Sequence, residues 1–135
     1  MSSLTHRRTI NPWQWQDQLG YAQAVEVTAG QRVLYCAGQT AIDAAGRPRH
    51  AGDMGAQLAL ALDNLEAVLR DGAYALGDVV RLNYYTTDVD RFFAHYGVAV
   101  SRLAAAGCRP GSTLLGVTRL AFPDLLVEVE ATAVR

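Results

Sequence analysis

The sequence predicts an α+β domain in which two helices cover one face of a mixed β-sheet. Three observations lead to this prediction. Apolar residues recur every three or four positions in 54–69 and in 92–103, the period of a helix that buries one face. Other stretches alternate apolar and polar residues, as strands do. The chain order is β-β-α-β-α-β-β, in which a helix between strands implies parallel pairing and a hairpin implies antiparallel pairing.

The chain is expected to begin with an irregular arm, residues 1–20. The arm carries Trp13 and Trp15, and we expect it to dock on its own domain through such large apolar side chains. Residues 21–27 alternate weakly and residues 32–39 form a β-rich run, so the two stretches predict a hairpin.

The first helix is the most regular element. Asp53 can accept a hydrogen bond from a free N–H of the first turn, and Gly72 is a suitable stop. One face of this helix carries Met54, Leu58, Ala61, Leu62, Leu65, Val68 and Leu69. A second helix is expected over residues 90–106, capped by Asp88 or Asp90.

Three further strands are expected at 79–87, 114–120 and 125–134, and the last two predict a hairpin around a Pro-Asp turn. In the last strand Val127, Val129, Ala131 and Ala133 share the face toward the helices. The opposite face of the sheet is expected to carry Arg81, Asn83, Tyr85, Leu114, Leu126, Glu128 and Glu130. This mixture is too apolar for solvent alone and too polar for a core, so we expect it to be buried against other copies of the chain.

Composition limits the function classes. The 135 residues form an arm and one domain, residues 21–135, with a net charge of −1. No basic stripe supports a nucleic-acid partner, and no apolar run approaches the roughly 20 residues of a membrane span. Arg7-Arg8 is not followed by an apolar region, so no signal peptide is expected and the expected location is cytoplasmic.

Residue chemistry also excludes several cofactors. The chain has no lysine, which excludes a lysine Schiff base and pyridoxal phosphate held by one. Two cysteines and three dispersed histidines show no zinc-ligand spacing. We therefore expect no cofactor and no metal. Cys36 is expected in the core, whereas Cys108 lies beside a turn, and a disulfide between them is unneeded in a reducing compartment.

Several segments, taken in order, resemble the Rid family, the YjgF-type reactive-intermediate deaminases often labelled endoribonuclease L-PSP. The segments are Cys36-Ala37-Gly38-Gln39, Leu62-Asp63-Asn64-Leu65, Asp78-Val79-Val80-Arg81 and Leu126-Val127-Glu128-Val129-Glu130-Ala131. The usual family forms are Ser-Gly-Gln, Leu-Asn/Asp-Asn-Val/Leu, Asp-Val-Val-Lys and Val-Glu-Ile-Glu-Ala. The resemblance runs from about residue 21 to the last residue.

The resemblance implies a chorismate-mutase-like fold and a homotrimer whose sheets face inward, with three pockets between subunits. Family members with deaminase activity hydrolyse enamines and imines such as 2-aminoacrylate to a keto acid and ammonia. An arginine in a Pro-Ala-Arg-Ser segment grips the substrate carboxylate as a bidentate fork. A glutamate positions the attacking water.

Carried over residue by residue, the resemblance implies that Glu128 is the catalytic acid/base and that Tyr21 and Gly38 line the pocket. Without the resemblance, Glu128 could equally be a solvated or salt-bridged strand residue. Tyr85 is a further pocket candidate because it shares the polar face. For Glu130 we expect an ion pair across an interface.

The match to the family breaks at the arginine. Gly111, just before Ser112, stands where the family has its arginine, and Tyr96 stands where the family usually has asparagine. Gly111 could be a plain turn glycine, a lost carboxylate clamp, or both. Arg109, two residues earlier, or Arg81 could replace the missing side chain, and we count Arg109, Ser112 and Tyr96 among the substrate-binding candidates.

Two functions remain open at this point. The first is an enzyme that hydrolyses a small enamine, imine or related conjugated acid without needing the arginine clamp. The second is a non-catalytic homotrimer that binds a metabolite in the same clefts. A ribonuclease role is a third hypothesis, which the family label suggests but no basic surface supports.

Overall fold

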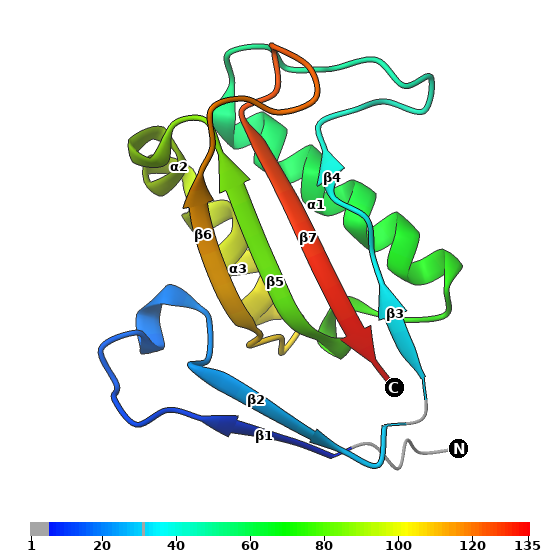
Figure 1. The fold of residues 1–135 in the computed structure, drawn as a ribbon, viewed down its shortest axis with the longest axis vertical. Coiled ribbons are helices and arrows are strands. Elements are labelled where there is room, and N and C mark those ends of the chain that lie inside the picture. Colours follow the sequence, from blue (N-terminus) through cyan, green and yellow to red (C-terminus); the bar gives the residue numbers. More distant parts are fainter. Residues whose placement is uncertain (1–5, 31) are drawn as a thin grey trace.

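The computed structural model describes residues 6–30 and 32–135, so the first five residues of the predicted arm lie outside the described part of the chain. The elements, in order, are β1 (His6–Ile10), β2 (Ala24–Thr28), β3 (Val33–Tyr35), β4 (Gln39–Thr40), α1 (Met54–Asp71), β5 (Val79–Thr86), α2 (Val89–His95), α3 (Gly97–Ala105), β6 (Gly111–Gly116) and β7 (Val127–Val134). The helices lie behind one sheet, and the β1–β2 hairpin extends below it (Figure 1).

The main sheet is mixed, as the sequence predicts. Its strand order is β3-β7-β5-β6, and β4 also pairs with β7. β5 and β6 are parallel, whereas β7 is antiparallel to its neighbours. Along β7 the side chains alternate between buried and half-buried, so the predicted inward face of Val127, Val129, Ala131 and Ala133 is confirmed. The other sheet face, here called the open face, has no helix of the described residues against it (Figure 1).

Helix α1 provides most of the core opposite the sheet. Asp53 accepts a hydrogen bond from the Ala56 N–H at 3.0 Å, and Gly72 ends the helix, both as predicted. The apolar stripe packs against β7 and β4, with Leu58, Leu65 and Leu69 fully buried. Burying such a leucine contributes about 1.5–3 kcal/mol, so this stripe fixes α1 on the sheet.

The predicted N-terminal hairpin is wrong. Strand β2 pairs with β1, which lies inside the arm, and β3 and β4 pair with β7 instead. Residues 6–10 are therefore a strand and not irregular chain. The arm does dock on its own domain, but through polar contacts and not by burying its tryptophans: the Arg7 guanidinium donates to the Val134 carbonyl at 2.6 Å and the Tyr96 hydroxyl donates to the Leu19 carbonyl at 2.7 Å. Trp13 and Trp15 stay 57% and 65% exposed.

The predicted C-terminal hairpin is also wrong, because β5 lies between β6 and β7. The parallel register pairs Tyr84 with Leu114 and Tyr85 with Leu115. Tyr84 is buried on the helix side, so Leu114 packs there too, and Leu115 takes the predicted place of Leu114 on the open face. The loop before β7 is thus a crossing connection.

The second predicted helix divides into α2 and α3 at Tyr96. Asp88 caps α2 by accepting from the Arg91 N–H at 3.1 Å. Gly97 follows the break, and glycine weakens a helix interior by about 1 kcal/mol relative to alanine. Within the described residues, no helix combines the length and apolar character that crossing a membrane requires.

Candidate functional site

Glu128 and Gly38 lie in direct contact. The short strand β4 pairs Thr40 with Glu128, which carries the preceding Gly38 over the Glu128 carboxylate. A Cβ atom on Gly38 would lie 1.7 Å from Glu128 Oε2, so glycine is the residue that leaves room for this carboxylate. The Asn64 side chain donates to the carbonyls of Thr40 and Ile42 at 2.8 and 2.9 Å and holds β4 on helix α1.

The Glu128 carboxylate lies in an environment that favours its protonated form. It is half-buried on the open face, and burial, followed by the neighbouring charge of Glu130, raises its pKa. A carboxyl with a raised pKa exchanges a proton with water more readily near neutral pH. Glu128 can therefore serve as a general base or acid toward a small molecule at this face.

Tyr85 and Glu130 form a pair beside this carboxylate. The Tyr85 hydroxyl donates to Glu130 Oε1 at 2.7 Å, and the Asn83 amide reaches the same oxygen at 3.4 Å. Tyr85, a predicted pocket residue, is thus fixed on the open face next to Glu128, with which it is paired in register. The ion pair that we expect for Glu130 across an interface stays a prediction.

A second feature is a cavity of about 300 Å³ between the arm, α2 and the helix side of β6. We call it the aromatic cavity, and it is lined by Trp15, Leu19, Tyr21, Tyr84, Phe92, Phe93, Tyr96, Ser112 and Leu114. Three predicted site residues, Tyr21, Tyr96 and Ser112, therefore meet here. The Tyr96 hydroxyl donates to the Leu19 carbonyl at 2.7 Å, which joins the arm to the helices.

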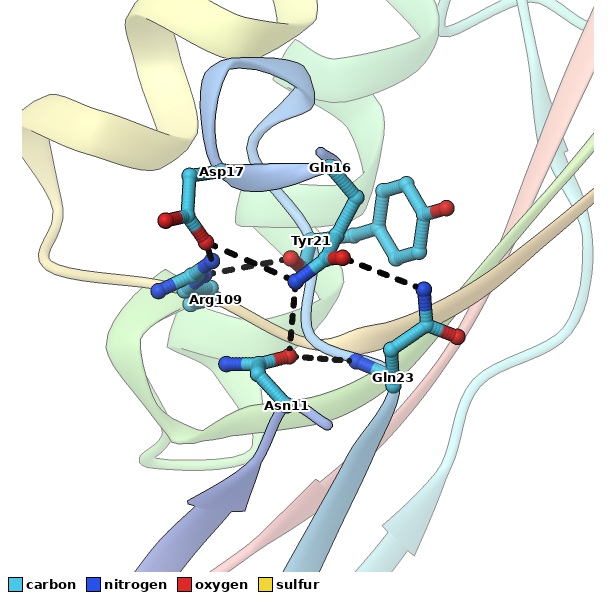
Figure 2. A network of polar contacts seen from close by, with 6 residues as sticks. All are labelled: Asn11, Gln16, Asp17, Tyr21, Gln23 and Arg109. Atoms are coloured by element: carbon cyan, nitrogen blue, oxygen red, sulfur yellow. Dashed lines mark hydrogen bonds and ion pairs between the residues drawn. The ribbon is translucent and has the colours of Figure 1, made fainter. Parts of the chain in front are cut away.

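Arg109 is used to hold the arm. Its Nε donates to the Tyr21 carbonyl at 3.1 Å, and its guanidinium forms an ion pair with Asp17 (Figure 2). Beside it, the fully buried Gln16 side chain donates to Asn11 Oδ1 at 3.0 Å. Figure 2 shows this polar network between the arm and the segment before β6, and the Tyr21 ring points away from it.

Gly111 is buried at the start of β6, opposite Arg81. A Cβ atom there would lie 3.6 Å from Arg81 Nη1, which is ordinary contact, so no steric conflict forces glycine at this position. The Arg81 guanidinium lies over Gly111 on the open face and donates to Thr113 Oγ1 at 2.6 Å. Gly111 does not line the aromatic cavity, but the next residue, Ser112, does.

The predicted site residues thus form two groups on one chain. Glu128 lies on β7, whereas Gly111, bridged to Ala22 next to Tyr21, begins β6 on the far side of β5. Two strand spacings of about 4.8 Å and four residues of about 3.3 Å separate Glu128 from Gly111 by about 16 Å. One small substrate cannot contact both groups within a single chain.

Sequence reasoning missed part of the cavity wall and one buried anchor. Trp15 and Leu19 lie in the arm that was expected to be irregular, although its tryptophans did indicate docking. Gln57 is fully buried and bonds to the Asp124 carbonyl and the Leu126 N–H, both at 2.8 Å. The sequence signal that could have identified Gln57 was its position as a polar residue within the apolar stripe of α1.

The cysteines have structural roles. Both are free and buried, which confirms the expectation for Cys36 and shows that Cys108 is buried although it lies beside a turn. Burial raises the pKa of the Cys108 thiol to about 12. Because the thiolate is the reactive form, Cys108 is not a candidate nucleophile.

A mixed sheet with helices on one face and a half-buried carboxylate on the other defines a small α+β protein of chorismate-mutase-like architecture. A model of the family described as Endoribonuclease L-PSP matches residues 16–135. The chain belongs to this family, which is also called the Rid or YjgF family.

Individual relatives support the same family assignment. The solved structure of YyfB from Yersinia pestis, a Rid-family protein of unknown function, matches with a TM-score of 0.83 and 36% identity over 96% of this chain and 98% of that chain. TdcF from E. coli, solved with bound serine, matches with a TM-score of 0.69 and 25% identity over 85% and 87% of the two chains. A RutC family protein of Pyrococcus horikoshii is 32% identical over 113 residues, 84% of this chain and 85% of that protein.

Proposed function

We propose that copies of this chain assemble as a homotrimer and hydrolyse imines or enamines in pockets between subunits. Water adds to the C=N carbon of the imine, an enamine first taking a proton at its β-carbon. The nitrogen then gains a proton and leaves as ammonia, and the carbon is left as a carbonyl. Glu128 takes the proton from water as it attacks and returns it to the leaving nitrogen. These reaction steps need no cofactor.

One observation carries this proposal: the Glu128 carboxylate lies under Gly38 with its pKa raised by burial. In this position a side chain on residue 38 would displace the carboxylate, so Gly38 and Glu128 are matched to each other. Family membership makes imine hydrolysis the reaction class that best fits this carboxylate.

The distance between the two groups of site residues supports a pocket made by two copies. The aromatic cavity of one subunit would meet Gly38 and Glu128 of the next. The open face also exposes large apolar side chains, with Tyr35 at 80% and Leu115 at 50%. Exposed apolar groups on one face favour burial between copies.

Gly111 limits the choice of substrate. Without an arginine at this position, a small substrate loses a bidentate, charge-assisted clamp on its carboxylate, worth about 1.5–3 kcal/mol or more. Arg109 does not supply a substitute, because it binds Asp17 and the Tyr21 carbonyl. The Arg81 guanidinium lies over Gly111 but already donates to Thr113 Oγ1, so it does not present a free bidentate fork. TdcF holds serine in its crystal structure, and we expect binding of so small an amino acid to be weak in this chain.

Enzymatically generated 2-aminoacrylate tests the proposal. We expect slow hydrolysis by the wild type, faster hydrolysis by Gly111→Arg, and none above background when Glu128→Ala is added to Gly111→Arg. Hydrolysis that survives Glu128→Ala would contradict the catalytic role. If Gly111→Arg and the wild type are both inactive toward every imine tried, the non-catalytic metabolite-binding homotrimer replaces the enzyme as the better account.

A further inference from the structure

The lining of the aromatic cavity selects for a particular kind of ligand. Six of its nine lining side chains are aromatic, and none is charged. An apolar cavity of about 150 Å³ is enough to bind benzene, so about 300 Å³ accommodates one ring with a short chain or a fused pair of rings. A carboxylate placed here would lose its water without gaining a cationic partner, which is strongly unfavourable.

The aromatic faces also suit the reacting group. An imine is protonated before or during water addition, and a cation near aromatic faces is stabilised by about 0.5–2 kcal/mol. Tyr84 adds one polar position: its hydroxyl is buried and has no hydrogen-bond partner among the described residues. The neighbouring Tyr96 hydroxyl donates to Leu19 instead. A ligand hydroxyl that reached Tyr84 would supply the missing partner.

The arm closes one side of the aromatic cavity. Trp15 and Leu19 form this wall, and Asp17 lies between them in the sequence. The Asp17–Arg109 ion pair and the Tyr96–Leu19 hydrogen bond fasten the same segment to the domain. Arg109 is therefore a positioning residue for the wall. Trp15 remains 65% exposed, so it can pack on a ligand without being part of the core.

We infer that the aromatic cavity binds the aryl group of a carboxylate-free imine or enamine, so that the substrates derive from arylalkylamines and not from small amino acids. The imine part of this inference rests on the proposed function; the binding of a neutral aryl compound does not. The reaction converts an arylalkyl imine and water into the corresponding arylalkyl aldehyde or ketone and ammonia. An amine-oxidising reaction is the class that would supply such a substrate.

Binding is tested with the two tryptophans of the chain as separate reporters. Trp13→Phe leaves Trp15 in the cavity wall, and Trp15→Phe leaves Trp13, which does not line the cavity. The probes are 4-phenylbutan-2-one and, with the same ring and a carboxylate, 3-phenylpropanoate. We expect the ketone to change Trp15 fluorescence saturably, with a Kd at least tenfold lower than that of the acid. Trp13 fluorescence should stay unchanged. Equal affinity for the two probes, or no response of Trp15, would overturn the inference.

Tyr84→Phe tests the polar position. A phenol, 4-(4-hydroxyphenyl)butan-2-one, should bind more tightly than 4-phenylbutan-2-one to the wild type. Tyr84→Phe should remove this preference, so that the phenol and the phenyl ketone bind the variant with similar affinity. A preference that survives in Tyr84→Phe would overturn the assignment of Tyr84 as the contact.

Hydrolysis is tested with the imine that a flavin amine oxidase releases from 2-phenylethylamine, in competition with semicarbazide, which traps the imine. We expect faster hydrolysis of this imine than of 2-aminoacrylate, and Trp15→Ala should raise KM about tenfold while the matched Trp13→Ala does not. Ketone binding without hydrolysis of any imine would refute the proposed function and leave the cavity assignment standing. Hydrolysis of 2-aminoacrylate alone, without ketone binding, would refute the cavity assignment and leave the proposed function standing.

Discussion

Glu128 and Glu130 lie two residues apart on the open face of β7, and the charge on Glu130 acts on Glu128. Burial and then this charge raise the Glu128 pKa above its ordinary value of 4.5. If Glu128 acts as a base, kcat/KM should fall as the pH drops through this raised pKa. Glu130→Gln removes the second cause, so the acidic limb of a kcat/KM profile should move to lower pH and the plateau should persist. An unmoved limb would mean that another group controls it.

The same carboxylate should lower stability at neutral pH. A carboxyl whose pKa is higher in the folded chain than in the unfolded chain binds its proton more tightly when folded. Stability is therefore lost as the pH rises from the unfolded pKa through the folded one. Glu128→Gln should be more stable than the wild type at pH 7 and show no such gain near pH 4, by urea unfolding at fixed protein concentration. A gain in stability that is equal at both pH values would exclude ionisation as its cause.

The kcat of Glu128→Gln should fall about 10²–10⁴-fold.

Gly38 is expected to be intolerant of even one methyl group. Gly38→Ala places a Cβ atom on Glu128 Oε2, and the flexible carboxylate must move away. We expect a folded protein with at least tenfold lower kcat, since misplacing a catalytic group is costly even when the fold survives. Gly97→Ala is the matched control, because no atom outside its neighbours lies within 4 Å of a Cβ there. Equal activities of the two variants would mean that Glu128 is not held by this contact.

Among the elements, α1 is tied to the loop before β7 by Gln57. Its amide bonds to the carbonyls of His50 and Asp124 and to the Leu126 N–H. Gln57→Met keeps the length of the side chain but leaves these buried backbone groups without hydrogen-bond partners. We therefore expect the free energy of unfolding, measured with urea, to fall by about 2–4 kcal/mol. Gln18→Met, on the exposed arm, should change stability by less than about 0.5 kcal/mol. A similarly small effect of Gln57→Met would contradict the bonding described here.

Local elements could be predicted from the sequence where their cause is local. Helix α1 has its cap, its stripe and its stop within 53–72, and all three are confirmed. The hairpins failed because strand partners are chosen by the whole sheet: β5 enters between β6 and β7, and β1 competes for β2. The alternation along β7 survived, since it depends on which face is buried and not on which strand is adjacent.

The candidate site shows the same division. Glu128 and Gly38 could be named from short segments, because each belongs to a recognisable run of residues. The cavity wall could not be, since Trp15 and Leu19 reach Tyr96 and Leu114 only through the folded arm. Likewise Arg109 looked available for substrate, and only its contacts with Asp17 and Tyr21 show its position at the arm.

In the proposed trimer, each pocket takes its cavity from one subunit and Glu128 from the next. Two inactive variants can test this when expressed together with different tags. Glu128→Gln keeps the cavity, and Ser112→Phe fills it but keeps Glu128. Sedimentation should first show that each variant alone is a trimer of normal mass; a monomeric wild type would already contradict the account.

The mixed trimers give the decisive measurement. In each mixed trimer one pocket in three combines an intact cavity with an intact Glu128, so random assembly at equal expression should restore imine hydrolysis to about a quarter of the wild-type rate. Each variant alone should remain inactive. If the mixed trimers form but hydrolyse imines no faster than the separate variants, the cavity and Glu128 do not act together across subunits, and the proposed site is contradicted.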